Sequence, residues 1–154
     1  MTDASTSAER SESILAQHKQ LRVALDELNA LLQSAPQIEA TAGWLSKLAA
    51  RLHDLLPVLA AHFEHEERSG LFAEIQAAWP ETATTCARLL AEHKALLEGL
   101  EGVRVSTAAG PTAVQTLPEL MGRGQALMRT LATHEEAENE LLVRVLDGAL
   151  AAQD

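Results

Sequence analysis

Six side chains in this sequence are of types that bind metal ions, and their spacing suggests that they act together. Two glutamates each follow a histidine by four residues, in the stretches HFEHE (62–66) and HEEAE (134–138). Residues four apart lie on one face of a helix, so each pair can present an imidazole nitrogen and a carboxylate to the same site. Imidazole suits zinc, copper, iron and nickel, and a carboxylate can bridge two ions. The candidate ligands are His18, His62, Glu66, His93, His134 and Glu138.

These six residues stand at positions where a leucine is expected. Apolar residues recur every three or four positions along four segments, which predicts four amphipathic helices with one buried stripe each. A carboxylate in such a stripe must be paired, protonated or bound to metal, because burying a bare charge is very costly. The four stripes are His18, Leu21, Leu25, Leu28, Leu32; Leu45, Leu48, Leu52, Leu55, Leu59, His62, Glu66; Cys86, Leu89, His93, Leu96, Leu100, Val103; and Leu117, Leu120, Gly124, Leu127, Leu131, His134, Glu138, Leu141, Val145.

The helices that position these residues are expected to form an all-α, up-down-up-down antiparallel four-helix bundle. Gly70 and Pro80 bracket a segment, 71–79, that has room for an extra turn of helix. Pro57 falls inside the second helix, which we expect to continue through it with a kink. The expected helices run over about 11–33, 41–68, 82–105 and 113–150. The expected domain division is a disordered lead-in at 1–10, the bundle at 11–150 and a tail at 151–154.

The helix boundaries also create a difficulty for a single site. The ligand comes early in the first expected helix and late in the second, but in the middle or later half of the third and fourth. The offset amounts to six to nine residues, or roughly 9–14 Å at 1.5 Å per residue. One common level therefore requires that the second and fourth helices overhang their neighbours.

Composition restricts the remaining possibilities. The chain has 154 residues, of which 47% are hydrophobic and 3% aromatic, which is typical of one all-α domain with an aliphatic core. A net charge of -10 argues against nucleic acid and anionic membrane as partners. No apolar run is long enough to span a bilayer, and the polar N-terminus does not resemble a signal peptide, so we expect a cytoplasmic location. The single cysteine, Cys86, excludes an internal disulfide.

Some chemistry is unsupported by the sequence. The chain contains no tyrosine, so a tyrosyl radical cannot form. We find neither a Ser/His/Asp arrangement nor a glycine-rich phosphate loop, which leaves hydrolase and nucleotide-binding functions without support. Ferritin-like di-iron proteins use Glu-x-x-His, whereas this chain has the reverse order and a longer spacing.

The order His, HxxxE, His, HxxxE over four helices resembles the hemerythrin-like, or HHE, cation-binding domains. The resemblance covers about residues 11–150 and is carried by HFEHEERSGLF (62–72), EHKALLEGL (92–100) and HEEAENELL (134–142). It implies a non-haem centre of two iron ions with a bridging oxo or hydroxo group. His18, His62, His93 and His134 would then be terminal ligands, with Glu66 and Glu138 as bridging carboxylates. The expected partner is a small diatomic ligand or peroxide; the sequence identifies no protein partner.

The chain differs from the oxygen carriers of this family in two places. Those proteins have HxxxH on the third helix, where this chain has Leu97, and HxxxxD on the fourth, where it has HxxxE. Two octahedral ions offer about twelve positions, of which four imidazoles, two bridging carboxylates and a bridging oxygen fill all but two. His65 and Glu135 flank the ligands in sequence, and we expect them to orient a ligand rather than to bind metal.

Three functions remain open on the sequence alone. The first is a di-iron protein that binds or senses dioxygen, nitric oxide, peroxide or iron. The second is a di-iron oxidase or peroxidase acting on dioxygen, peroxide or nitric oxide. The third is a metal-free helical interaction module. Metal analysis separates the third from the others, and turnover with peroxide and a reductant separates the second from the first.

Overall fold

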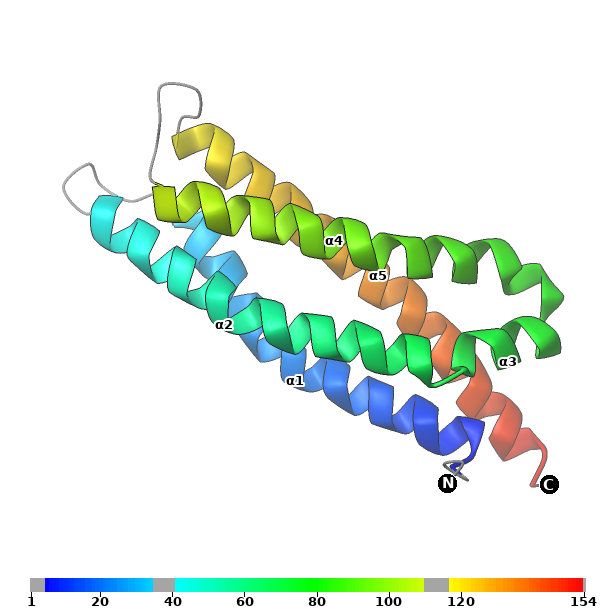
Figure 1. Cartoon of the computed structure of the whole chain (residues 1–154). Coiled ribbons are helices and arrows are strands. Elements are labelled where there is room, and N and C mark those ends of the chain that lie inside the picture. Colours follow the sequence, from blue (N-terminus) through cyan, green and yellow to red (C-terminus); the bar gives the residue numbers. More distant parts are fainter. Residues whose placement is uncertain (1–4, 35–40, 110–116, 154) are drawn as a thin grey trace.

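The computed structural model describes residues 5–34, 41–109 and 117–153. Four long helices run alternately in opposite directions, and α3 lies at the end of the bundle where both termini are found (Figure 1). The all-α, up-down-up-down four-helix bundle expected from the sequence is therefore confirmed, with one short helix added. The helices are α1 (Ser7–Gln33), α2 (Thr41–Arg68), α3 (Leu71–Ala78), α4 (Ala83–Ala109) and α5 (Leu117–Ala151), and a 3-10 turn, η2 (Pro80–Thr82), precedes α4.

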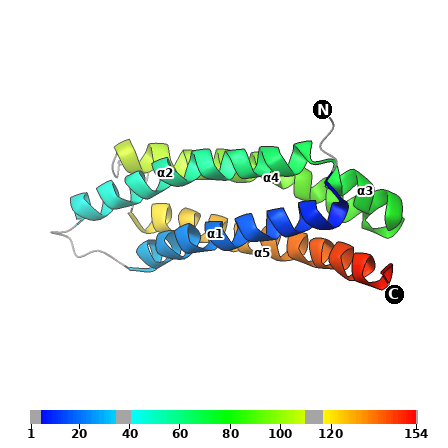
Figure 2. The same cartoon turned by 90° about the horizontal axis from the view of Figure 1, so that it is seen from below.

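The four long helices form a closed ring of neighbours. α1 packs against α2 and α5, and α4 packs against the same two helices. In the view turned by 90°, α1 and α5 make one layer while α2 and α4 make the other (Figure 2). Every neighbouring pair is antiparallel, and each of the four helices turns one stripe of buried side chains towards the central axis.

Helix α1 begins at Ser7, four residues before the expected boundary, because Thr6 caps it. The Thr6 hydroxyl accepts a hydrogen bond from the Glu9 backbone N–H at 3.1 Å, and the Glu9 carboxylate accepts one from the Thr6 N–H at 2.7 Å. This reciprocal capping box satisfies two N–H groups that a helix start otherwise leaves unpaired. Residues 7–10 of the expected lead-in are thus helical, and residues 1–4 lie outside the described residues.

The other boundaries agree more closely with expectation. Helix α2 has the expected bounds and continues through Pro57. Helix α4 extends to Ala109, four residues beyond the expected end at Val105. Helix α5 is described from Leu117, and the expected first residues of this helix, 113–116, lie outside the described part of the chain.

A tight turn at Gly70 joins α2 to α3. Gly70 has φ of +70°, a left-handed conformation that glycine adopts without steric cost. Helix α3 then continues beyond the end of α2 and buries Leu71, Phe72 and Ile75 (Figure 1). The Arg10 guanidinium donates to the Ser69 carbonyl at 2.6 Å, which ties the start of α1 to this turn. The short segment suspected from Gly70 and Pro80 is therefore two turns of helix that extend the core.

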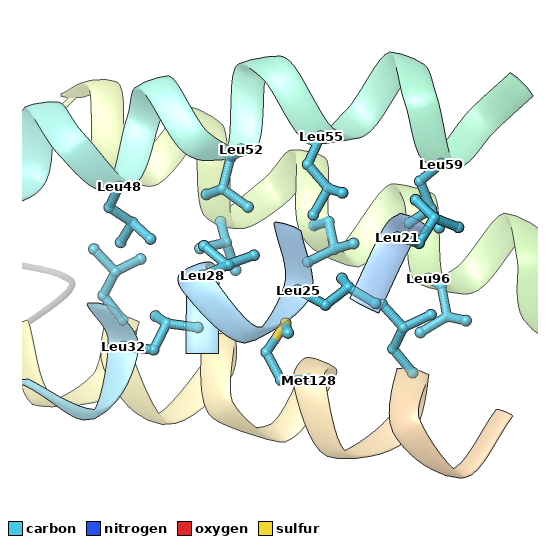
Figure 3. Packing of buried hydrophobic residues seen from close by; sticks show 14 of the residues in the cluster. Leu21, Leu25, Leu28, Leu32, Leu48, Leu52, Leu55, Leu59, Leu96 and Met128 are labelled. Atoms are coloured by element: carbon cyan, nitrogen blue, oxygen red, sulfur yellow. The ribbon is translucent and has the colours of Figure 1, made fainter. Parts of the chain in front are cut away.

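The apolar stripes predicted from the sequence pack along the axis (Figure 3). Of the stripe positions, only Leu117 and Leu127 are half-buried rather than buried, and Met128 takes the buried place beside the latter. Helices α1 and α5 approach closely at Gly124, where an added Cβ would lie 2.7 Å from Leu32 Cδ2. The stripe pattern thus placed nearly all of its own residues correctly, but buried residues such as Ile14, Phe63, Leu142 and those of α3 lie outside it.

The core is divided into two apolar clusters. The larger cluster contains residues of all four long helices, from Leu21 on α1 to Leu131 on α5. The smaller cluster joins Ile14 and Cys86 to the buried residues of α3 and of the C-terminal part of α5. On α1, α4 and α5 the candidate ligands fall between the two clusters, and on α2 they lie at the end of the larger cluster, just before α3. A polar layer is therefore enclosed by apolar side chains above and below.

None of the helices in the described ranges is both long and apolar enough to cross a membrane.

Candidate metal centre

All four long helices contribute ligands to one buried layer. The difference in height between ligands on different helices, which the expected helix boundaries implied, is therefore absent. His18 lies eleven residues after the start of α1 at Ser7, and His93 lies ten residues after the start of α4 at Ala83, so the two have nearly the same depth. Helix α5 runs well past His134, and α3 covers the length that α2 lacks. The overhang required for a common level is thus supplied by α3 and by the long α5.

Within the described residues, the six predicted ligands form two groups whose ligand atoms lie within 4.8 Å of one another. We call them the first group (His18, His62, Glu66 and Glu138) and the second group (His93, His134 and Glu138). Glu138 belongs to both groups, which is the placement expected of a bridging carboxylate. Glu66 belongs to the first group alone.

The contacts of Glu138 show how the two groups meet. Its Oε2 lies 3.2 Å from His18 Nε2, and its Oε1 lies 3.2 Å from His93 Nε2. Oε1 also makes a close contact with His134 Nε2, and Glu66 Oε1 makes a similar one with His62 Nε2. Every one of the four imidazoles therefore directs Nε2 towards a carboxylate at the axis.

The donor atoms in this layer fit a cation. Among the described residues, buried atoms without a hydrogen-bond partner include His18 Nε2, His134 Nε2, Glu138 Oε2 and both carboxylate oxygens of Glu66. Buried polar atoms are nearly always hydrogen-bonded, so orphaned atoms gathered in one place need an explanation. Imidazole and carboxylate lone pairs that converge on shared points are satisfied together by metal ions.

Protonation of the imidazoles balances the carboxylates when no metal is bound. Burial disfavours the charged form of His18, but the Glu138 and Glu66 carboxylates outweigh it and raise its pKa to about 10. Burial is outweighed in the same way at His93 and His134, whose pKa values are also raised. Burial acts against the ionised form of Glu138 too, yet its imidazole neighbours hold the pKa of that carboxyl well below its usual range. Metal binding must therefore release protons from these imidazoles.

The other ring nitrogen of each histidine is also occupied. In all four cases Nδ1 lies at hydrogen-bonding distance from a side-chain oxygen on a neighbouring helix. Because these oxygens only accept, Nδ1 carries a proton and donates it, so once the imidazole is neutral its lone pair is on Nε2, which faces the metal site. The pairs are His18 with Asn139 Oδ1 at 2.6 Å, His62 with Gln17 Oε1 at 2.7 Å, His93 with Glu67 Oε1 at 3.0 Å and His134 with Glu92 Oε2 at 2.8 Å.

These four acceptors, which we call the outer acceptors, were missed by the sequence analysis although a simple signal marks them. Each is the immediate sequence neighbour of a ligand: Gln17 and Glu92 precede a histidine, while Glu67 and Asn139 follow a glutamate. Adjacent residues are rotated by roughly 100° about a helix axis. The neighbour of an inward-facing ligand therefore points sideways, towards the next helix.

Phe63 and Leu97 border the second group. The Phe63 ring stacks on His93 with centroids 4.1 Å apart and an interplanar angle of 8°, and it meets His134 edge-on. Leu97 is half-buried one turn beyond His93 and lines the same small surface pocket as Phe63. Apolar side chains thus occupy this side of the site. Leu97 stands at the position where the HxxxH pattern of the oxygen carriers has its second histidine.

The two flanking residues expected to orient a ligand are placed differently. His65 is exposed and is not an outer acceptor of any of the four histidines. Glu135 is buried, and its Oε2 lies 3.5 Å from Arg22 Nη2, while its Oε1 has no hydrogen-bond partner among the described residues. Burial raises the pKa of this carboxyl. Neither residue belongs to the first or the second group.

The comparison with known families agrees with this geometry. The family described as the hemerythrin HHE cation binding domain matches residues 10–146. The chain belongs to this family. The matched region contains all four long helices, so the HHE domain is essentially the whole bundle. Searches of curated proteins and of solved structures returned no match.

Membership of the HHE family and the donor atoms of the layer lead to the same function. The hemerythrin-like bundle binds metal cations, and its histidines and glutamates are available for that purpose. The sequence resemblance to HHE domains is confirmed.

Proposed function

We propose that this chain is a non-haem di-iron protein that binds or senses dioxygen, nitric oxide, peroxide or iron. One observation carries the proposal: two groups of buried imidazole and carboxylate donors share Glu138, and several of their atoms have no other partner. One tetrahedral ion needs four ligands, and six are gathered here. The number of ligands therefore favours two ions over one.

The donor types favour iron. Mixed imidazole and carboxylate ligands suit ions that accept both nitrogen and oxygen donors, and the carboxylates can bridge. In this proposal His18, His62, His93 and His134 are terminal ligands, and Glu138 bridges together with an oxo or hydroxo group. Glu66 binds the ion of the first group. Two redox-active ions supply the electrons for reaction with a small oxidant.

Access to the site supports a small exogenous partner. A groove of about 540 Å³ runs between α1 and α2 and is lined by His62, its acceptor Gln17 and the apolar side chains of Leu21 and Leu55. Diatomic molecules and peroxide are small enough to approach the layer from this groove. The proposal includes a cytoplasmic location and neither a nucleic-acid nor a membrane partner, as the charge of -10 suggests.

Metal analysis tests the proposal directly. Protein purified without chelators should contain two metal ions per chain, predominantly iron, and its Mössbauer spectrum should show coupled iron sites. A single zinc ion per chain, or no metal after reconstitution with ferrous iron under anaerobic conditions, would contradict it.

A second candidate function is a di-iron oxidase or peroxidase. The observation in its favour is that Leu97 stands where the oxygen carriers have a ligand, so protein side chains leave coordination positions open. Steady-state turnover of peroxide with a reductant would establish this activity. Binding without turnover would restrict the protein to sensing or storage.

A further inference from the structure

The outer acceptors divide the metal centre into two unlike halves. In the first group, His18 and His62 donate to the neutral amide oxygens of Asn139 and Gln17. In the second group, the histidines donate instead to the carboxylates of two glutamates. These are Glu67, which accepts from His93, and Glu92, which accepts from His134.

The inner ligands are divided in the opposite sense. The first group has two carboxylates, Glu66 and Glu138, whereas the second group has Glu138 alone. Beside His93 lies the apolar Phe63 ring, which stacks on it, and not a second carboxylate. The second group therefore has fewer carboxylates in contact with the ion than the first group, but more carboxylates among its outer acceptors.

A carboxylate acceptor changes the imidazole that donates to it. When Nδ1–H donates to a carboxylate, the ring gains anionic character and its Nε2 becomes a more basic ligand, and the hydrogen bond also fixes the ring orientation. An amide acceptor fixes the orientation but does not supply the charge. Glu92 is itself held in place, because its other oxygen accepts from Arg88 at 2.6 Å. The second group thus has stronger donors than its count of inner ligands suggests.

We propose that Glu67 and Glu92 are positioning residues for the ion of the second group, which compensate through His93 and His134 for the inner carboxylate that this group lacks. The first group, with four ligand residues, fills first, and the two outer carboxylates set how tightly the second ion is held. This inference rests on the proposed function, since it requires two ions.

Conservative variants test the charge separately from the hydrogen bond. Glutamine keeps an oxygen acceptor but removes the charge, so Glu67→Gln and Glu92→Gln should weaken the second binding step and leave the first unchanged. Loss of an outer partner typically lowers metal affinity by about 10–100-fold. The assay is a titration of the metal-free chain with Zn²⁺ against a chromophoric chelator, repeated with Fe²⁺ under anaerobic conditions.

Matched variants provide the controls. Glu64→Gln on α2 and Glu101→Gln on α4 remove carboxylates that pair with arginines rather than with histidines, and both binding steps should stay as in the unchanged chain. Gln17→Glu adds an outer carboxylate to the first group, so by the same reasoning it should tighten the first binding step. Circular dichroism establishes that each variant is folded.

Two spectroscopic readouts distinguish positioning from a structural role. In NMR of the zinc-loaded chain, the His93 Nδ1–H proton should stay hydrogen-bonded and slow to exchange in Glu67→Gln and lose this protection in Glu67→Ala. In Mössbauer spectra of the iron-loaded chain, Glu92→Gln should alter the signal of one iron and not the other.

The failures of the two proposals are distinguishable. If the unchanged chain binds fewer than two ions of either metal, the proposed function fails and this inference fails with it. If the unchanged chain binds two ions, but Glu67→Gln and Glu92→Gln weaken both steps equally or neither step, only the inference is overturned.

Discussion

Replacement of Glu138 should empty the whole site, whereas replacement of Glu66 should empty half of it. Glu138 is fully buried and contacts three of the four imidazoles, and both ligand groups depend on it. Glu66 contributes to the first group alone. We therefore expect Glu138→Gln to hold almost no metal and Glu66→Gln to retain about one ion per chain, while Glu101→Gln keeps two.

The expected effect on stability follows from linkage. An ion present at about 100 times its dissociation constant stabilises the folded state by roughly 2.7 kcal/mol. In a domain of this size, 1 kcal/mol shifts Tm by roughly 2–4 °C, so each ion should raise Tm by about 5–11 °C. Metal addition should raise the Tm of Glu66→Gln by about half as much as that of the unchanged chain. It should leave the Tm of Glu138→Gln nearly unaltered.

The assay compares each variant with itself. Calorimetry with and without metal gives the rise in Tm for one variant at a time, so the effect of the substitution on the metal-free chain cancels. Metal content is measured on the same samples by mass spectrometry. The reasoning is refuted if Glu138→Gln still binds two ions, or if the two variants lose equal amounts of metal.

Three further predictions concern protonation, the open position and the core. The raised pKa of His18 means that its proton stabilises the metal-free chain fully below pH 6.5, and this contribution is lost as pH rises towards 10. Because metal displaces that proton, the rise in Tm on metal addition should grow over this range; a rise that is independent of pH would contradict the assignment. Leu97→His should slow the oxidation of the reduced centre by air, followed by absorbance, and an unaltered rate would show that this position lies too far from the ions. Leu59→Ala should cost about 2–5 kcal/mol in urea unfolding, because Leu59 is fully buried, without changing metal stoichiometry.

Much of the fold could be predicted because period and burial are closely linked in a helix. The positions at which His18, His93 or Glu138 replace an expected leucine proved to be buried, since any residue in that register faces the axis. The start of α1 was missed although Thr6 and Glu9 form a recognisable capping box. The stripe of α5 was misassigned by one residue near Leu127, which is half-buried while Met128 is buried.

The outer part of the site could not be predicted in the same way. Which residue accepts from His62 depends on how α1 and α2 are rotated against each other, and the period of a single helix carries no information on that rotation. Neighbours such as Gln17 and Glu92 look like ordinary surface residues of an amphipathic helix. The common level of the ligands likewise depended on α3, whose direction after Gly70 is a property of the turn.

The four hydrogen bonds between histidines and outer acceptors form a closed cycle with one sense of rotation. Helix α1 supports the histidine of α2, α2 that of α4, α4 that of α5, and α5 that of α1. The acceptor precedes the neighbouring ligand in sequence on α1 and α4 and follows it on α2 and α5. Because α2 and α5 run opposite to α1 and α4, both arrangements rotate the acceptor in the same sense about the bundle axis. Two parallel neighbours would break the cycle, because their acceptors would point to the wrong side. Chain reversal at every connection is thus a condition for supporting all four imidazoles, and a designer who copies this layer must keep the alternation of helix directions along with the ligands.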